Sequence, residues 1–260
     1  MRLEGSAAII TGAAQGIGRA IALEFANQGA DMLLADVQPE KLANVAAEVG
    51  EMGRRAVPVT VDVTNTNQVQ HMVNRALQEY GKIDVLVNDA GGSGNIGIQH
   101  IEDVTDDMWD LIVDVNLKSA FLCCREVVPH MRKQQSGRIV NISSSSAKGH
   151  FGDLGTSAIR LPYAAAKSGI IGFTYQLAKD VAPDGIYVNA VMPGFVLTEA
   201  GARVNDRFQE LSEQAKETLT GNVPLGRAGE PQEVAKAVSF LASDEASFTT
   251  GTVLEVTGGR

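Results

Sequence analysis

The sequence has 260 residues, 44% of them hydrophobic and 20% charged, with a formal net charge of −9. A chain of this length and composition can bury a sizeable core. The acidic balance argues against a nucleic-acid surface, and no apolar run is long enough to span a bilayer, so neither nucleic acid nor a membrane is an expected partner. The only two cysteines, Cys123 and Cys124, are adjacent, and the first residues do not resemble a signal peptide, so we expect a reduced, cytoplasmic protein. The four histidines form no tight ligand cluster, and no metal is expected.

Short apolar runs alternate with helical patterns along most of the chain. The predicted strands cover residues 7–11, 31–35, 56–63, 83–88, 137–143, 186–192 and 252–256. The predicted helices cover residues 16–29, 39–52, 66–80, 105–133, 161–181 and 231–242. Because the strands are almost continuously apolar, this alternation predicts an α/β fold in which a parallel sheet has helices on both faces.

No linker rich in Pro, Gly or Ser divides the chain, and we interpret residues 1–260 as one domain. Two connections, at about 144–161 and about 193–224, are longer than a compact fold needs. Both follow a predicted strand, so they should lie at the carboxyl edge of the sheet, where such folds bind ligands. We expect them to be substrate loops.

A glycine-rich turn, TGAAQGIG at residues 11–18, connects the first strand to the first helix. Gly12, Gly16 and Gly18 permit a tight turn, and with Gln15 and Ile17 they bring a helix N-terminus to a position where it can bind a pyrophosphate. The spacing is not that of the general G-x-G-x-x-G fingerprint. A packing turn would look the same, so the two interpretations remain equally open on this stretch alone.

Carboxylates and small residues follow the next three strands. Asp36 ends the second strand, where it can accept hydrogen bonds from ribose hydroxyls and repel a 2′-phosphate. No Lys or Arg occurs in residues 36–38, so we predict NAD rather than NADP; the alternative is a simple turn residue. Further candidate cofactor contacts are Asp62 and Val63 after the third strand, and Asn88, Ala90 and Gly91 after the fourth. Plain loops would explain these five residues about as well.

Tyr163 and Lys167 lie near the start of the predicted 161–181 helix, four residues apart. Residues at this spacing share one helix face, so the phenol and the ammonium group can approach each other. A free phenol is mostly protonated near neutrality, and a nearby positive charge favours its ionised form. An ordinary exposed pair on a surface helix is the alternative.

These motifs together resemble the short-chain dehydrogenase/reductase family over nearly the whole chain. The resemblance rests on TGxxxGIG at 11–18, NDAG at 88–91, Asn116 in DVNLKSAF, ISSS at 142–145, YxxxK at 163–167, Pro193-Gly194 and Thr198. It implies a three-layer, doubly wound Rossmann fold with a seven-stranded parallel sheet, an NAD-dependent oxidoreductase and a homotetramer.

The resemblance also implies roles for individual residues. Tyr163 is expected to be the general acid/base, Lys167 to lower its pKa and bind the nicotinamide ribose, and Asn116 to hold a water in a proton path. Ser144 is expected to bind the substrate oxygen, although Ser143 and Ser145 are close enough to leave a one-residue doubt; a capping role in the serine-rich loop is its alternative.

The segment after the sixth strand is expected to face the nicotinamide, and residues 199–222 to form a lid. Its expected cofactor contacts are Pro193, Gly194, Val196 and Thr198. The candidate substrate contacts are Ser144, Ser146, Arg160 and Phe195, with Arg160 as a partner for an acidic group or simply a solvated cation. In two places the chain departs from the usual pattern: Asp89 replaces an Asn, and the stretch between Ser144 and Tyr163 is longer than in many members.

The resemblance implies hydride transfer between NAD and a secondary alcohol or ketone, with a polyol, sugar or hydroxy acid as the expected substrate type. One alternative is a 3-oxoacyl carrier-protein reductase, although Asp36 argues against the usual NADPH-driven form of that reaction. Another is a catalytically silent dinucleotide-binding regulator, which would be expected to lack the Tyr, Lys or Ser that this chain retains.

Overall fold

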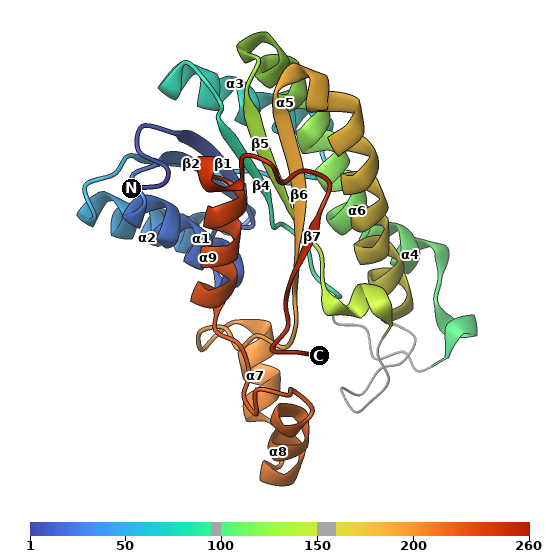
Figure 1. Cartoon of the computed structure of the whole chain (residues 1–260). Helices are drawn as coiled ribbons and strands as arrows, with labels where there is room; N and C mark the ends of the chain where they lie inside the picture. The colour runs from blue at the N-terminus through green and yellow to red at the C-terminus, as the bar shows by residue number, and fades with distance from the viewer. Residues whose placement is uncertain (95–99, 150–159) are drawn as a thin grey trace.

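Seven parallel strands form one sheet in the computed structural model of the chain, which describes residues 1–94, 100–149 and 160–260 (Figure 1). The strands are β1 (Ala7–Thr11), β2 (Asp31–Asp36), β3 (Ala56–Thr60), β4 (Val85–Asn88), β5 (Gly137–Ile142), β6 (Ile186–Pro193) and β7 (Val253–Val256). Their order in the sheet is β3-β2-β1-β4-β5-β6-β7. The order reverses between β1 and β4, which creates a crevice at the carboxyl edge. The predicted seven-stranded, doubly wound parallel sheet is confirmed.

Helices cover both faces of this sheet, and one pair extends beyond its edge. They are α1 (Gly16–Asn27), α2 (Pro39–Glu51), α3 (Thr66–Tyr80), α4 (Asp106–Val113), α5 (Ser119–Gln134), α6 (Arg160–Val181), α7 (Arg203–Gln209), α8 (Glu213–Gly221) and α9 (Pro231–Leu241). Local signals set their ends: the Asn65 side chain caps α3 by accepting from two backbone N–H groups, and Gly81 ends it in the left-handed conformation. None of the helices that the structure describes has the length and apolar character needed to cross a membrane.

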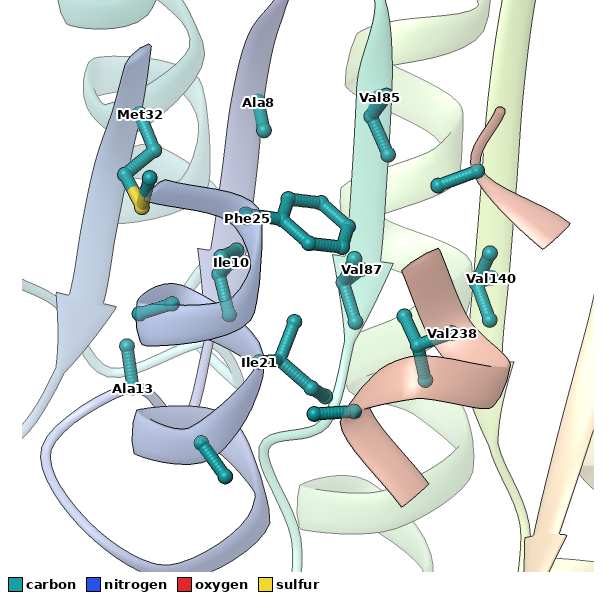
Figure 2. Packing of buried hydrophobic residues seen from close by; sticks show 14 of the residues in the cluster. Ala8, Ile10, Ala13, Ile21, Phe25, Met32, Val85, Val87, Val140 and Val238 are labelled. Carbon is teal, nitrogen blue, oxygen red and sulfur yellow. The ribbon is translucent and has the colours of Figure 1, made fainter. Parts of the chain in front are cut away.

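Alternate strand residues point to opposite faces, which divides the buried side chains into two cores. On one face, Phe25 and Ile21 of α1 pack with Ile10, Val87 and the Val238 side chain of α9 (Figure 2). Phe25 has no exposed surface, and burying such a side chain contributes about 1.5–3 kcal/mol.

The second core lies under α3, α5 and α6 and includes Ile9, the neighbour of Ile10 on β1. Cys123 and Cys124 belong to this core as buried, free thiols on α5. The Asn88 Nδ2 donates to the Cys124 Sγ at 3.4 Å, and burial raises the pKa of Cys124 to about 12.

The predicted helix over 105–133 is present as a continuous helical stretch, but it is not α-helical throughout. A single π-helical turn, η2 (Asp114–Lys118), separates α4 from α5. In such a turn the backbone hydrogen bonds join residues five apart instead of four, and these turns often occur at functional sites. Here the Ser119 hydroxyl donates to the carbonyls of Val115 (2.8 Å) and Asn116 (3.2 Å), which satisfies groups that a regular helix would pair internally.

The structure describes the whole of one predicted substrate loop, residues 193–224, and only part of the other, residues 144–161. The 193–224 stretch contains α7 and α8, which project beyond the carboxyl edge of the sheet (Figure 1). In the 144–161 stretch a short 3₁₀ turn, η3 (Ser145–Lys148), follows β5, and α6 begins at Arg160. The residues between, 150–159, lie outside the part of the chain that the structure describes.

Candidate functional site

A cleft of about 650 Å³ opens at the carboxyl edge of the sheet, next to the point where the strand order reverses. Most of the residues predicted for the site line this cleft: Gly12, Gln15, Gly16, Ile17, Asp36, Asp62, Val63, Ala90, Gly91, Ser144, Ser146, Arg160, Tyr163, Lys167, Pro193, Gly194, Phe195, Val196 and Thr198. Three predicted residues, Gly18, Asn88 and Asn116, do not line it. Predicted residues up to 186 positions apart in the sequence, from Gly12 to Thr198, thus converge where the crossover topology predicts a ligand.

Tyr163 and Lys167 share one face of α6 at the cleft, with the Lys167 Nζ 5.7 Å from the centre of the Tyr163 ring. Lys167 is almost fully buried and donates to the Ile142 carbonyl at 2.8 Å. Burial lowers the pKa of Lys167 to about 8, and the negative charge of Asp89 acts against that fall. The arrangement brings a polarisable phenol and a buried cation to the same wall of the cleft.

Asp89 is the carboxylate that replaces the usual Asn, and it lies in an electrostatically demanding position. Its backbone N–H and that of Ala90 both donate to the Thr11 hydroxyl at 3.2 Å, which joins the turn after β4 to the end of β1. Burial raises the pKa of Asp89 to about 7; Lys167 opposes this rise, and Asp36 adds to it. Asp89 therefore interacts electrostatically with both Lys167 and Asp36.

Hydrogen bonds distinguish the serines after β5. Ser143 is buried, and its hydroxyl donates to the Lys167 carbonyl at 2.9 Å, so it anchors α6 to the sheet. Ser144 lines the cleft, as does Ser145. The Ser144 hydroxyl also accepts from the Ser146 N–H at 3.2 Å, so it caps η3 while it faces the cleft.

Asn116 lies behind the cleft in the π-helical turn. Its side-chain amide donates to the carbonyls of Ile112 (2.8 Å) and Gly92 (2.9 Å), and its Oδ1 accepts from the Gly92 N–H at 3.1 Å. Gly91 separates it from Lys167: a Cβ added there would collide with the Asn116 Oδ1 and lie 3.4 Å from the Lys167 Nζ. Asn116 therefore shapes the cleft through the backbone of the Gly91–Gly92 segment.

Asn88 and Asp62, two predicted cofactor residues, have their side chains engaged by neighbours. Asn88 is buried and donates to the Asn141 Oδ1 at 2.8 Å, within the sheet rather than at the cleft. Asp62 lines the cleft, but its Oδ1 accepts from the Thr64 N–H (2.9 Å) and hydroxyl (2.7 Å).

Asp36, at the end of β2, lines the same cleft as Tyr163. Its Oδ2 accepts from the Ala14 N–H at 3.1 Å and its Oδ1 from the Gln38 N–H at 3.0 Å. The structure also brings the cation of Lys41 to the glycine-rich turn, which the sequence did not reveal. The Lys41 Nζ donates to the Gln15 Oε1 at 2.6 Å.

The glycine-rich turn fits a bound dinucleotide phosphate. Gly12 has a φ of +70°, and a Cβ there would lie only 2.8 Å from the Ala90 nitrogen. Gly16 has a φ of +62° and begins α1, whose N-terminus favours an anion. Above it, the Thr198 hydroxyl is buried and has no hydrogen-bond partner among the described residues. The glycines leave room for a phosphate-containing ligand close to the backbone. Such a ligand would also give the buried Thr198 hydroxyl a hydrogen-bond partner.

Sequence reasoning missed one direct contact on this turn. The Gly16 N–H donates to the Glu199 Oε1 at 2.7 Å, across 183 positions of sequence. No local pattern marks such a long-range contact. By contrast, Asp89 could be singled out because it departs from the usual residue. Among the described residues, no group of three or more His, Cys, Asp or Glu side chains is arranged to hold a metal ion.

Comparisons with known proteins agree with this geometry. A family described as enoyl-(acyl carrier protein) reductase matches residues 12–260. The 3-oxoacyl-(acyl-carrier-protein) reductase of Thermotoga maritima is 41% identical over 259 residues, which cover 100% of this chain and 99% of that one. BbsD of Thauera aromatica, a subunit of a hydroxy(phenyl)methyl-succinyl-CoA dehydrogenase, is 36% identical over 260 residues. The match covers 100% of this chain and 98% of BbsD.

Solved structures of reductases and dehydrogenases are also similar to this chain over almost its whole length. The crystal structure of levodione reductase superposes with a TM-score of 0.89 at 34% identity and covers 99% of this chain and 98% of its own. A 7α-hydroxysteroid dehydrogenase in complex with NADH and a 7-oxo bile acid superposes with a TM-score of 0.88 at 30% identity, over 99% of this chain and 95% of its own.

Proposed function

The chain belongs to the short-chain dehydrogenase/reductase family, and from this premise we propose that it is an NAD-dependent oxidoreductase that interconverts a secondary alcohol and a ketone. The observation that carries the proposal is the convergence of Tyr163, Lys167 and Ser144 on the cleft that also contains the glycine-rich turn and Asp36. Hydride transfer requires a site that binds the dinucleotide and an acid/base group that moves the substrate proton. The glycine-rich turn and the Tyr163–Lys167 pair are proposed to supply these in one cleft.

Tyr163 is the general acid/base in this proposal. When bound, the nicotinamide supplies the hydride acceptor or donor. During oxidation the Tyr163 oxygen takes the hydroxyl proton of the substrate, and during reduction it returns a proton to the carbonyl oxygen. The buried ammonium group of Lys167, 5.7 Å from the ring centre, stabilises the phenolate form. Ser144 donates to the substrate oxygen and holds it near Tyr163.

Ser143 and Asn116 support this group through contacts with the backbone around Lys167. Ser143 binds the backbone of Lys167 and so fixes the position of α6. Asn116 is proposed to hold a water in the proton path to Lys167, and its contacts with the Gly91–Gly92 segment beside Lys167 support that role.

NAD is the proposed cofactor because Asp36 presents a carboxylate where a 2′-phosphate would have to lie. We expect kcat/KM to favour NAD over NADP by at least about tenfold. Asp36→Ala with Val37→Arg should relax this preference, and adding Lys41→Ala shows whether the cation beside Gln15 contributes. A wild-type preference for NADP would contradict the role given to Asp36.

A 3-oxoacyl thioester reductase is the second candidate. It is favoured by the names of two relatives, which specify acyl-carrier-protein and coenzyme A thioesters. Polyols, sugars and hydroxy acids remain the first candidate substrates, with Ser146, Arg160 and Phe195 as the proposed substrate contacts lining the cleft. A silent dinucleotide-binding regulator is disfavoured, because all three catalytic residue types are present.

A paired substrate screen separates these candidates. Purified protein is assayed for NAD reduction with polyols, sugars, hydroxy acids and cyclic alcohols, and for NADH and NADPH oxidation with acetoacetyl-CoA and acetoacetyl-N-acetylcysteamine. Turnover of the thioesters alone supports the reductase. If no compound is turned over while NADH still binds, the regulator is supported.

A homotetramer in the cytoplasm completes the proposal. Aromatic side chains of the helices that cover one side of the sheet are exposed, namely Trp109 (39%) on α4, Phe121 (44%) on α5 and Tyr175 (44%) on α6. Large exposed apolar side chains on packed helices are typical of subunit contacts. The free thiols of Cys123 and Cys124 suit a reducing compartment.

A further inference from the structure

Three carboxylates from three separate segments lie against the backbone of the glycine-rich turn, and two of them accept hydrogen bonds from it. Asp36, the last residue of β2, accepts from the Ala14 N–H at 3.1 Å, and Glu199 after β6 accepts from the Gly16 N–H at 2.7 Å. Asp89 after β4 approaches the same turn, because a Cβ built on Gly18 would lie 2.8 Å from the Asp89 Oδ2. The N-terminal end of α1, where the helix dipole favours negative charge, is therefore already in contact with the chain's own anions.

Only one of these three carboxylates is able to leave easily. Asp36 and Asp89 are partly buried, and Asp36 is the last residue of β2 while Asp89 directly follows β4. Glu199 is exposed and belongs to the connection between β6 and α7. It also binds the N–H of Gly16, the first residue of α1, which is the group best placed to receive a phosphate.

We propose that Glu199 occupies the anion position of the glycine-rich turn in the free protein, and that the cofactor pyrophosphate displaces it. This inference rests on the proposed function, because it requires that the cleft bind a dinucleotide. Two anions cannot share one set of N–H donors, and a pyrophosphate carries more negative charge than a carboxylate. Glu199 therefore lowers cofactor affinity by competition.

The displacement has a consequence for the segment that leads from β6 into α7. Thr198 lies directly over Gly16, since its Cγ2 would be 3.3 Å from a Cβ built there. The Thr198 carbonyl accepts from the Asn205 amide of α7 at 2.6 Å. Phe208 and Leu211, at and after the end of α7, and Leu219 of α8 line the same cleft as the turn. Release of Glu199 therefore removes one of the contacts that join the turn to the segment leading into α7.

The test compares cofactor binding to the wild type, Glu199→Ala and Glu199→Gln by NADH fluorescence titration and calorimetry. Loss of a competing charged hydrogen bond should tighten NADH binding by about 5- to 30-fold in Glu199→Ala, with Glu199→Gln between it and the wild type. Inorganic pyrophosphate, used as a probe for the turn alone, should follow the same order. Glu217→Ala removes the same charge from an exposed position on α8 and should leave the NADH Kd within about twofold.

Hydrogen exchange gives a second readout. In the free protein, amides of residues 199–209 should exchange faster in Glu199→Ala than in the wild type, and NADH should reduce that difference. Equal or weaker NADH binding by Glu199→Ala would overturn the inference and, in the weaker case, show that Glu199 supports the binding conformation. The proposed function would survive either result; it fails only if no form of the protein binds a nicotinamide cofactor.

Discussion

Tyr163 is the side chain on which turnover should depend most. It lines the cleft beside the buried Lys167, and phenylalanine retains the ring but removes the oxygen that carries the proton. Tyr163→Phe should lower kcat by about 10²–10⁴-fold, the usual contribution of a general acid/base. The NADH Kd should stay within about twofold of the wild type, measured by fluorescence titration. Lost cofactor binding would instead assign the residue a structural role.

Asp89 should govern how the activity depends on pH. Its negative charge opposes the fall of the Lys167 pKa that burial causes. Asp89→Asn removes this charge, so the pKa of Lys167 should fall further and the ammonium form should be lost at a lower pH. The decline of kcat on the alkaline side should therefore begin at lower pH than in the wild type.

A kcat–pH profile across neutral and alkaline pH checks this prediction. Glu51→Gln, which neutralises an exposed acid at the end of α2, is the matched control and should leave the profile unchanged. Superimposable profiles for Asp89→Asn and the wild type would show that another group controls the alkaline decline.

At this scale the sequence predicted residue types better than contacts. The serine-rich step after β5 left the choice among Ser143, Ser144 and Ser145 open, because four consecutive serines, residues 143–146, look alike in sequence; the hydrogen bond of Ser143 to the Lys167 carbonyl narrows that choice. Glu199 could not be found at all, since its partner Gly16 is distant in sequence and the contact depends on how β6 leaves the sheet.

The element that differs most from expectation is the π-helical turn between α4 and α5, and Asn116 is the residue that should stabilise it. Its amide satisfies the Ile112 carbonyl within the helix and the Gly92 backbone beyond it. Asn116→Ala leaves these buried groups without partners and should lower the free energy of unfolding by about 1–3 kcal/mol.

Urea denaturation measures this loss. Asn67→Ala, on an exposed position of α3, is the matched control and should change stability by less than about 0.5 kcal/mol. Equal effects of the two substitutions would show that the π-helical turn does not depend on Asn116.

Helix periodicity explains why this turn was not predicted. Apolar residues continue through 105–133, and one extra residue in a turn barely disturbs the pattern. The same limit applies to α7 and α8: short polar helices have no continuous apolar face, so the 193–224 stretch looked like a loop. Long strands and capped helices such as α3 were predicted closely, because burial and capping act locally.

For the whole molecule, the exposed aromatics of α4, α5 and α6 predict association. Light scattering after size exclusion should give four times the mass of one chain. Phe121→Asp places a charge on the exposed face of α5 and should yield smaller species without loss of helical circular dichroism. A monomeric wild type at assay concentrations would contradict the proposed tetramer.

The order of the strands was the part of the architecture that alternation alone could not supply. Apolar runs predict that the strands are parallel and buried, but many orders of seven parallel strands satisfy that condition. The resemblance carried by scattered motifs predicted a doubly wound sheet of seven strands, and the structure supplies the order of those strands, with Ile10 opposite Val87 across the β1–β4 reversal.

The two adjacent thiols on α5 offer a direct view of how the molecule opens. Cys123 and Cys124 are sealed between the helix and the sheet, and burial suppresses their thiolate forms. A thiol reagent can therefore react only after α5 has separated from β4 and β5. The labelling rate in native buffer then reports the free energy of that separation, and a change of this rate on adding NADH would measure how far cofactor binding is felt on the opposite face of the sheet.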